Sequence, residues 1–366
     1  MVSDKPLGRQ LRRFSGAVRA EIPRLLAAYQ AVTDAGTVCY VDQPGRPRRI
    51  RPWCDAIEIG AMFGLVPGGM SRDEWVAALR GFQEPVTGLV PEHIPDDARL
   101  NAPRAAEPRY EDRYNTMIVN YALECLGSHL AHPVTNAEDL DSGLLQETLG
   151  SLSWNDESWG AGHWVDTYAS CLCVNRKYFA RGRQIEALFI WLDAACDPET
   201  GMWGKWREKD RWLQPVNGFY RLTRGTYAQF GRPLPHPESA IDTILTHVSD
   251  RACFSEGHGN ACNVLDMVHP LWLCLKTSDH RKEEASAWMA DRLPDILARW
   301  QDHGFAFDPA FDEGSQGEAS LQGTEMWLSI VYLMADVLGL ADCLAYRPRG
   351  VHRLEMALKN HTSVPE

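Results

Sequence analysis

The sequence predicts an all-α protein, an (α/α)6 toroid in which six helical hairpins close around a common axis. Three observations lead to this prediction. A strongly apolar helical run that begins with polar residues recurs six times, amphipathic helical segments lie between these runs, and similar glycine-containing turns recur along the chain. Repeats at intervals of about 45 to 60 residues are typical of helix-pair architectures.

The six apolar runs are predicted to form an inner layer of helices. Residues 328–340, for example, are apolar on nearly every side, so a helix there must be covered from several directions. Each run also opens with polar residues, which marks the place where chemistry is expected. The runs are residues 51–65, 111–127, 159–174, 215–230, 259–275 and 321–340.

The segments between the runs predict an outer layer of helices with one solvent-exposed face. They place apolar residues at i, i+3 and i+4, and one of them begins with Pro237 and Glu238, which suit a helix start. Pro294 is expected to kink or break its helix. The first outer helix is expected from 17–30 or from 353–360, and the others from 72–83, 183–196, 237–248 and 281–300.

Similar turns follow the outer segments. Residues 83–91 and 196–204 both contain Thr-Gly, and 300–309 is a weaker copy. Gly88 and Gly201 are expected at positive φ, which glycine adopts readily. The succession of outer helix, this turn and inner helix resembles the α/α-toroid superfamilies, which include six-hairpin glycosidases, polysaccharide lyases, terpenoid cyclases and protein prenyltransferases.

The resemblance covers about residues 50–340 and implies that catalytic residues lie where the inner helices begin. A ring of six helix pairs needs about 300 to 360 residues at this repeat length. Residues 1–366 are therefore predicted to form one domain, with the terminal helices completing the outer layer around the core at about 50–340.

The composition excludes several classes of protein. The formal net charge of -12 and the pI of about 5.5 argue against a nucleic-acid partner, because an acidic protein repels phosphate. The basic run at Arg46, Arg48, Arg49 and Arg51 is interpreted as a solvated surface strip. No apolar stretch is long enough for a membrane span and no export signal is apparent, so a cytoplasmic protein with reduced cysteines is expected. The oligomeric state is not predicted.

Unpaired backbone N–H groups at the helix starts favour anionic side chains or ligands there, so the first candidates come from the polar residues of each run. His163 and Asp166 are i,i+3 neighbours on one helix face. Such a pair fits general acid–base chemistry. The alternative is a capping carboxylate beside a hydrogen-bonded histidine.

The fifth and sixth runs supply the other catalytic candidates. Asn263, Asp266 and His269 form one stripe, and an aspartate inside an apolar run is costly to bury unless it is paired or used. Asp266 could instead tie the helix distortion expected at Pro270, and Glu325 could simply complement the helix dipole. The predicted catalytic residues are His163, Asp166, Asp266, His269 and Glu325.

Loop tryptophans and polar residues at the run starts are the predicted substrate-binding groups. Arg221 suits bidentate binding of a carboxylate or phosphate, with a salt bridge to a capping acid as the alternative. The predicted binding set is Trp154, Asp156, Trp159, Trp203, Trp212, Asn217, Tyr220, Arg221, Asn263 and Gln322. Further polar residues that open the runs or precede them are Asp55, Glu58, Tyr114, Asn115, Glu256, His258, Asp312 and Glu313.

Several well-known motifs are absent from the sequence. It has no Walker A loop, no dinucleotide-binding G-x-G-x-x-G, no G-x-S-x-G elbow and no H-E-x-x-H, so no cofactor and no metal are expected. Cys262, Asp266 and His269 match the zinc ligands of protein prenyltransferases in residue type, but their spacing differs. The D-x-D-D and D-D-x-x-D acids of terpene cyclases are missing.

These observations favour a carbohydrate-active enzyme of the glycoside hydrolase, lyase or epimerase type. Carboxylates would act as acid and base on a small-molecule or oligosaccharide substrate. The first alternative is a terpenoid cyclase-like or prenyltransferase-like enzyme, which would need a deep apolar cavity rather than a wide polar groove. The second is a non-catalytic binding protein, in which no carboxyl group would have a perturbed pKa.

Overall fold

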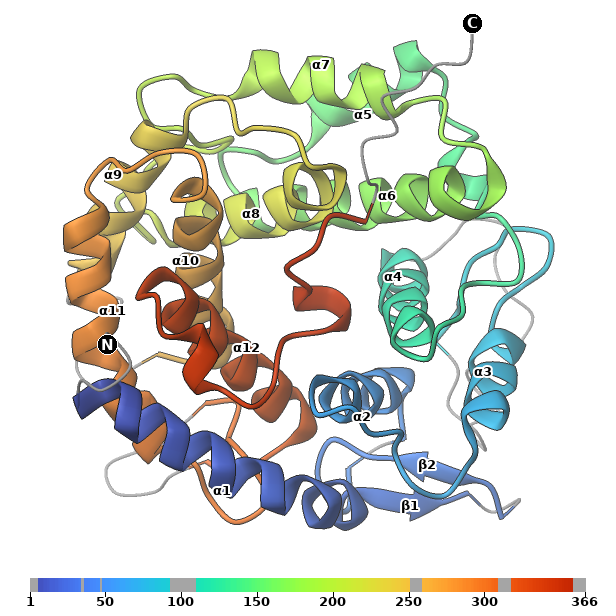
Figure 1. The fold of residues 1–366 in the computed structure, drawn as a ribbon. Coiled ribbons are helices and arrows are strands. Elements are labelled where there is room, and N and C mark those ends of the chain that lie inside the picture. Colours follow the sequence, from blue (N-terminus) through green and yellow to red (C-terminus); the bar gives the residue numbers. More distant parts are fainter. Residues whose placement is uncertain are drawn as a thin grey trace, which may run out of the picture.

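The computed structural model describes residues 6–33, 36–46, 48–92, 110–250, 259–308 and 317–357. Within these residues the chain forms twelve α-helices and one two-stranded antiparallel hairpin, so the predicted all-α class is confirmed. The helices lie in two layers, with the even-numbered helices toward the centre and the odd-numbered helices at the periphery (Figure 1).

Each predicted apolar run contains one of the even-numbered helices, here called the inner helices. They contact one another in chain order from α2 to α12, and α12 packs back against α2. The helical contacts therefore return to the helix at which they begin. The inner helices are α2 (Ile50–Met62), α4 (Tyr110–Cys125), α6 (Ser158–Phe179), α8 (Leu213–Thr223), α10 (Ala261–Cys274) and α12 (Leu321–Val337).

Four of the outer helices agree with predicted segments. The structure also decides which of the two proposed segments forms the first outer helix. The N-terminal segment forms that helix, whereas residues 353–357 form none, and 358–360 lie outside the described residues. Pro294 does not end its helix. The fifth helix was not predicted, because it is short and buries only Leu145 and Leu149. The outer helices are α1 (Pro6–Ala28), α3 (Arg72–Gly81), α5 (Ser142–Ser151), α7 (Ile185–Ala195), α9 (Pro237–Val248) and α11 (Lys282–Ala298).

The smaller elements were also not predicted. The hairpin pairs β1 (Gln30–Val32) with β2 (Val38–Tyr40), and Ala31 lies opposite Cys39. Strands this short leave no readable alternation of polar and apolar residues. The short helical turns are η2 (Thr135–Ala137), η4 (Ala341–Cys343), η5 (Gly350–His352) and η3 (Arg224–Ala228), the last a π-helical turn that continues α8.

The two Thr-Gly turns have the same conformation, as their sequences predict. Gly88 has φ of 72° and Gly201 of 69°. Each glycine donates its N–H to a carbonyl four residues earlier, on Glu84 at 2.8 Å and on Asp197 at 2.7 Å. A Cβ at Gly201 would lie 2.5 Å from the backbone nitrogen of Ala240. These turns therefore need glycine for both φ and space.

Glycines also let α6 and α8 approach closely. A Cβ on Gly162 would overlap the backbone of Gly218, and a Cβ on Gly225 would lie 2.6 Å from Cα of Asp166. Without side chains at these points the two backbones come into contact. This approach brings Asp166 of α6 against Arg224, which directly follows α8.

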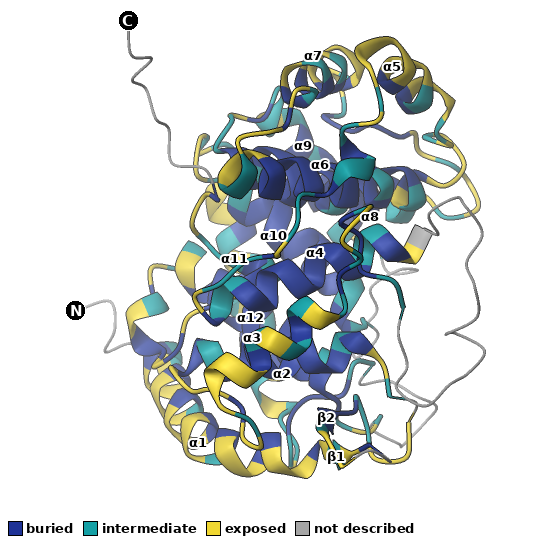
Figure 2. Cartoon of the chain, turned by 90° about the vertical axis from the view of Figure 1, so that its right-hand side faces the viewer, coloured by how far each residue is buried: buried dark blue, intermediate teal, exposed yellow. Residues whose placement is uncertain are grey.

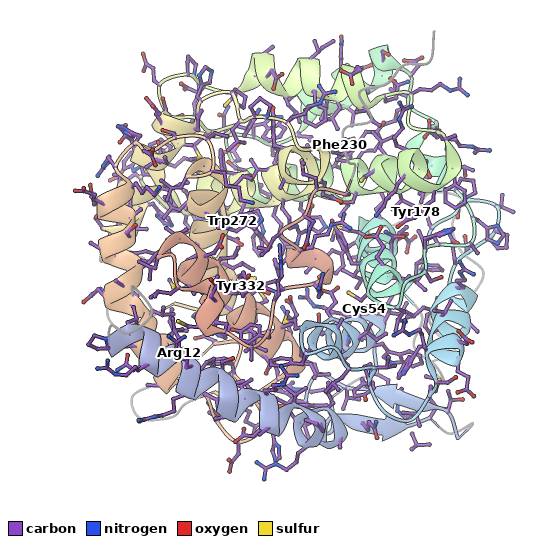
Figure 3. The ribbon with its side chains drawn as sticks, in the orientation of Figure 1. Arg12, Cys54, Tyr178, Phe230, Trp272 and Tyr332 are labelled. Atoms are coloured by element: carbon purple, nitrogen blue, oxygen red, sulfur yellow. The ribbon has the colours of Figure 1, made fainter. Side chains whose placement is uncertain are left out.

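Burial follows the two layers. The inner helices are buried along most of their length, whereas the outer helices alternate buried and exposed residues (Figure 2). Side chains fill the centre of the molecule, among them Trp272 of α10 and Tyr332 of α12 (Figure 3). The nine described cysteines are free thiols. No helix in the described residues is both long enough and apolar enough to cross a bilayer.

Candidate functional site

Two adjoining pockets lie at the end of the molecule where inner helices begin. The upper pocket has a volume of about 710 Å³, within the range of small-molecule sites. Most of its lining residues are charged or polar, and they include Arg46, Arg49, Arg51, Asp55, Glu318 and Gln322. Of the four arginines interpreted as a solvated strip, Arg46 and Arg49 are exposed as predicted, and these two line the pocket together with the half-buried Arg51.

The lower pocket shares Arg51, Asp55 and Gln322 with the upper pocket. Its volume of about 20 Å³ leaves room for roughly one water molecule. A larger ligand therefore fits only the upper pocket. It would contact the residues that the two pockets share, which form the floor of the upper pocket. The remaining walls come from four inner helices and the C-terminal segment, and include Glu58, Tyr114, Tyr220, Arg221, Cys262 and His352.

Arg51 connects two helices at the junction of the pockets. Its Nε donates to Asp55 Oδ2 at 3.2 Å on the same helix, and its Nη1 donates to the Tyr114 hydroxyl on α4. Burial raises the pKa of Asp55 to about 7, against the opposing effect of Arg51. Burial also raises the pKa of Tyr114, although Arg51 and Arg221 act in the other direction. The site thus combines a carboxyl group that titrates near neutral pH with a protonated phenol.

A second carboxyl group lies at the base of the lower pocket. Glu58 is buried, and its Oε2 accepts a hydrogen bond from the Val351 backbone at 3.0 Å. Burial raises its pKa well above the usual value, and Glu325 contributes in the same direction. Gly350 has φ of 64°, and a Cβ there would overlap the Glu58 carboxyl group. The C-terminal segment therefore closes the lower pocket from below.

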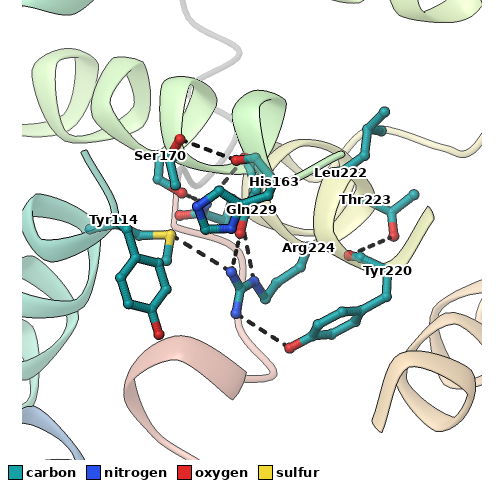
Figure 4. Close-up of polar contacts among 12 residues, drawn as sticks. Tyr114, His163, Ser170, Tyr220, Leu222, Thr223, Arg224 and Gln229 are labelled. Atoms are coloured by element: carbon teal, nitrogen blue, oxygen red, sulfur yellow. Dashed lines mark hydrogen bonds and ion pairs between the residues drawn. The ribbon is translucent and has the colours of Figure 1, made fainter. Parts of the chain in front are cut away.

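A buried hydrogen-bonded chain runs through the inner helices, and Figure 4 shows the part of it that joins Arg224 to Tyr220. Arg224 forms an ion pair with Asp166 and donates from Nη1 to the Tyr220 hydroxyl at 3.3 Å. That hydroxyl lies 2.8 Å from His352 Nε2, and His352 Nδ1 lies 2.8 Å from Glu325 Oε1. Burial raises the pKa of Asp166 while Arg224 opposes the rise. Two predicted catalytic carboxylates are therefore held by partners within the chain.

Asp266 has a different environment from the other two carboxylates. Its side chain is fully buried, and neither carboxyl oxygen has a hydrogen-bond partner among the described residues. Burial raises its pKa to about 8, with Arg221 and Arg224 opposing the rise. Asp266 is therefore protonated at neutral pH. Arg221 is half-buried, and its Nε has no hydrogen-bond partner in the described part of the chain.

The two predicted histidines lie at different ends of the inner helices. The His163 ring packs 5.4 Å from the Tyr114 ring, and burial lowers its pKa well below the usual value, with Arg221 contributing. His269 instead lines a third pocket at the opposite end, together with Trp272. None of the five predicted catalytic residues lines the upper or the lower pocket. They are His163, Asp166, Asp266, His269 and Glu325.

Some of the predicted binding residues line the lower pocket, and others lie elsewhere in the molecule. Asn217 Nδ2 donates to Asn263 Oδ1 at 3.3 Å, which joins α8 to α10, while Tyr220, Arg221 and Gln322 line the lower pocket. Among the tryptophans, the indole N–H of Trp154 donates to Leu149 O and that of Trp203 to Leu192 O, each at 2.8 Å. Trp212 is half-buried and Trp159 is partly exposed, while Asp156 forms a surface ion pair with Arg207. Glu256, His258, Asp312 and Glu313 lie outside the described residues.

Three residues that line the lower pocket were not predicted as site residues, namely Arg51, Arg224 and His352, and Cys262 was named only for its resemblance to a zinc ligand. Arg224 carried a usable signal, because an arginine within an apolar run needs a buried partner. Arg51 was hidden in a basic run, and His352 lies in a segment without helical periodicity. Within the described residues, no group of three or more His, Cys, Asp or Glu side chains is arranged to hold a metal ion.

Comparison with known proteins assigns no family to the chain. No family model matches it, and no curated protein and no solved structure is significantly similar to it.

Proposed function

We propose that the two helical layers form the (α/α)6 toroid that the sequence predicts, within a single domain. The support is the order of the helix contacts, which run from α2 to α12 and back to α2. The alternation of inner and outer helices along the chain agrees with this arrangement (Figure 1). In such a toroid the upper pocket is the mouth at which the inner helices begin.

We further propose that the protein is a carbohydrate-active enzyme of the lyase type that acts on an acidic saccharide. One observation carries this proposal. Arg46, Arg49 and Arg221 form no ion pair with a carboxylate among the described residues, yet they line the same two pockets as Asp55. Guanidinium groups bind carboxylates strongly and in bidentate fashion. Asp42, Asp55, Asp308 and Glu318 also line the upper pocket, but none of them pairs with Arg46 or Arg49, so a uronate residue there would give these two guanidinium groups a carboxylate partner.

The proposed reaction is a β-elimination. Asp55 takes the proton from the carbon next to the uronate carboxylate, and its pKa of about 7 suits a base at neutral pH. Arg49, in the wall of the upper pocket, stabilises the charge that develops on the carboxylate. Tyr114 gives its proton to the departing glycosidic oxygen. The carbon–oxygen bond breaks as the carbon–carbon double bond forms, and solvent then restores both protonation states.

The other candidate functions have less support. A terpenoid cyclase needs acids in the wall of an apolar cavity, whereas the apolar third pocket has Glu355 as its single acidic lining residue and most residues around the upper pocket are charged or polar. A carboxyl group with a raised pKa in a pocket wall favours catalysis over binding alone. In this proposal His163 positions the Tyr114 ring, and the ion pair of Asp166 with Arg224 supports the floor of the site. A catalytic role for Asp266 or Glu325 stays a prediction.

The proposal is tested with polygalacturonate, alginate and hyaluronan as substrates. Elimination produces an unsaturated uronate, which is followed by its ultraviolet absorbance. We expect turnover of at least one of the three polymers, and none of the same polymer after its carboxylates have been reduced to alcohols. Asp55→Asn and Tyr114→Phe should each reduce turnover at least about 100-fold. Asp279→Asn, on the far surface in an ion pair with Lys282, is the matched control.

Two results would overturn the proposal. The first is that none of the three polymers yields the unsaturated product. The second is that Asp55→Asn and Tyr114→Phe turn over as fast as Asp279→Asn while keeping the wild-type unfolding midpoint. New reducing ends without ultraviolet absorbance would show hydrolysis and would exclude the elimination step.

A further inference from the structure

A third pocket, here called the distal pocket, lies at the opposite end of the inner helices from the proposed active site. Its volume is about 610 Å³, which is large enough for a small organic ligand. The second half of α10, the chain after η3 and the C-terminal segment form its walls. Its apolar lining includes Tyr227, Leu234, Trp272, Leu273, Leu354 and Met356.

Lys276 is the cation of this pocket that lacks an acidic partner. Its Nζ lies 3.4 Å from the centre of the Trp272 ring, and no described carboxylate is within ion-pair distance of it. Asp336 is the acid that most affects Lys276, but its Oδ2 accepts the Trp272 indole N–H at 2.8 Å. By contrast, Arg232 pairs with Glu186 and Arg353 pairs with Glu124. Glu355 also lines the pocket but pairs with Arg347, so the exposed Lys276 has no carboxylate of its own among the described residues.

A second polar group in the pocket also lacks a partner. His269 is 2% exposed, and its Nδ1 has no hydrogen-bond partner among the described residues. Burial lowers its pKa well below the usual value, so the ring is neutral and can donate or accept one hydrogen bond. An unsatisfied buried polar atom costs free energy that a ligand atom would recover.

These groups lie on α10 and on the turn that follows it, and their spacing defines the size of a ligand. His269, Trp272 and Lys276 are at positions i, i+3 and i+7, which share one helix face. Seven residues of α-helix span about 10 Å. The unpaired imidazole and the unpaired ammonium group are therefore separated by a stretch of apolar wall that includes the Trp272 ring.

We propose that the distal pocket binds a medium-chain carboxylate. Its carboxylate pairs with Lys276, its apolar chain lies against Trp272 and Leu234, and a polar atom at its far end forms a hydrogen bond with His269 Nδ1. Binding is non-covalent and independent of the proposed elimination. A cationic amphiphile is disfavoured, because the cations Arg224, Arg232, Lys276 and Arg353 around this pocket outnumber its acidic lining residue, Glu355.

Calorimetric titration of the full chain with octanoate, 8-hydroxyoctanoate, octan-1-ol and octylammonium tests this proposal. We expect octanoate to bind at least tenfold more tightly than octan-1-ol, octylammonium to bind most weakly, and added NaCl to weaken octanoate binding. Lys276→Met should remove the preference for octanoate over octan-1-ol. Lys282→Met, a surface change on α11, should leave it unchanged. His269→Phe should remove any advantage of 8-hydroxyoctanoate over octanoate, and Leu234→Trp should weaken all four ligands.

Three results would overturn the proposal. Octanoate and octan-1-ol could bind wild-type protein equally well, octanoate could bind Lys276→Met as tightly as Lys282→Met, or folded protein could give no binding heat with any of the four ligands. Circular dichroism of each variant separates loss of binding from loss of folding. The binding of octylammonium in place of octanoate would reverse the assigned charge and reject the proposal as well.

Discussion

The upper and distal pockets lie at the two ends of the same set of inner helices, yet their charges follow different rules. At the distal end, Lys276 lies just beyond α10, where a basic group is stabilised by the helix dipole. At the starting end, Arg51 lies in the first turn of α2, where the dipole opposes a positive charge. The dipole alone accounts for the first placement, whereas the second depends on Asp55 and the Tyr114 hydroxyl, to which Arg51 donates. The comparison teaches that a charge placed against a helix dipole marks a position where side-chain partners outweigh the backbone.

The largest expected effect on stability comes from the ion pair that lies between the two ends. Arg224 lines both the lower and the distal pocket and is buried in an ion pair with Asp166. Arg224→Met leaves that carboxylate without its partner, which should lower the free energy of unfolding by about 3–5 kcal/mol. The loss should grow with rising pH, because the unpaired carboxyl group must then ionise in a buried place. Urea denaturation at pH 5 and pH 8 measures both effects.

A double-mutant cycle controls this first prediction. Adding Asp166→Asn to Arg224→Met removes the buried charge and should restore part of the lost stability. Lys282→Met breaks the exposed ion pair with Asp279 and should change stability by no more than about 1 kcal/mol. An Arg224→Met loss equal to that of Lys282→Met would show that the central ion pair does not hold the two ends together.

The pH dependence of stability tests the buried acid between the two ends. Asp266 has a pKa raised to about 8, whereas an unfolded aspartate titrates near pH 3.9. Between these values the folded state binds more protons than the unfolded state, so stability falls as pH rises. Asp266→Asn removes this loss. Between pH 5 and pH 7.5 the variant should gain on wild type by up to about 1.4 kcal/mol per pH unit, measured by urea denaturation. Parallel stability curves would contradict the raised pKa.

Closure of the lower pocket by the C-terminal segment provides the third test. In Gly350→Ala the added Cβ meets the Glu58 carboxyl group and φ remains positive. We expect a loss of about 2 kcal/mol or more, from backbone strain together with displacement of the segment. Gly64→Ala has a similar φ of 74° but open space around its Cβ, so it isolates the strain, at about 1 kcal/mol. Equal losses of thermal stability in the two variants would mean that the contact with Glu58 is unimportant.

The sequence allowed the helices to be predicted more completely than the contacts between them. The six inner helices and the two Thr-Gly turns follow from local patterns, namely apolar periodicity and the φ requirement at Gly88 and Gly201. The hairpin and α5 were missed because both are short and bury few residues. Toroidal closure, the single domain and the cytoplasmic location stay predictions.

The partners of polar side chains could not be predicted from the same patterns. Arg224 and Asp166 are 58 residues apart, and their contact depends on how α6 and α8 are rotated against each other. Periodicity identifies the buried face of a helix but not the residue that it meets. His352 reaches Tyr220 from a segment with no regular pattern. The sequence thus singled out the starts of the inner helices, while the proposal of Asp55 rather than Asp166 as the base depends on which side chains line the pockets.

The smallest expected effect concerns two helix caps. Ser320 caps α12 by accepting a hydrogen bond from the Gly323 N–H at 3.0 Å, and it also lines the upper pocket. Ser71 caps α3 in a capping box with Glu74, away from all three pockets. Ser320→Ala and Ser71→Ala should each cost about 1 kcal/mol of stability, measured by thermal denaturation.

Turnover separates the two caps even though their stabilities match. Only Ser320→Ala alters the start of α12, which carries Gln322 at the floor of the upper pocket, so only this variant should reduce turnover on a uronate polymer, by a few-fold. Ser71→Ala should react at the wild-type rate. If both variants turn over alike, the start of α12 does not position the substrate, and the contrast between the two ends rests on Arg51 and its neighbours alone.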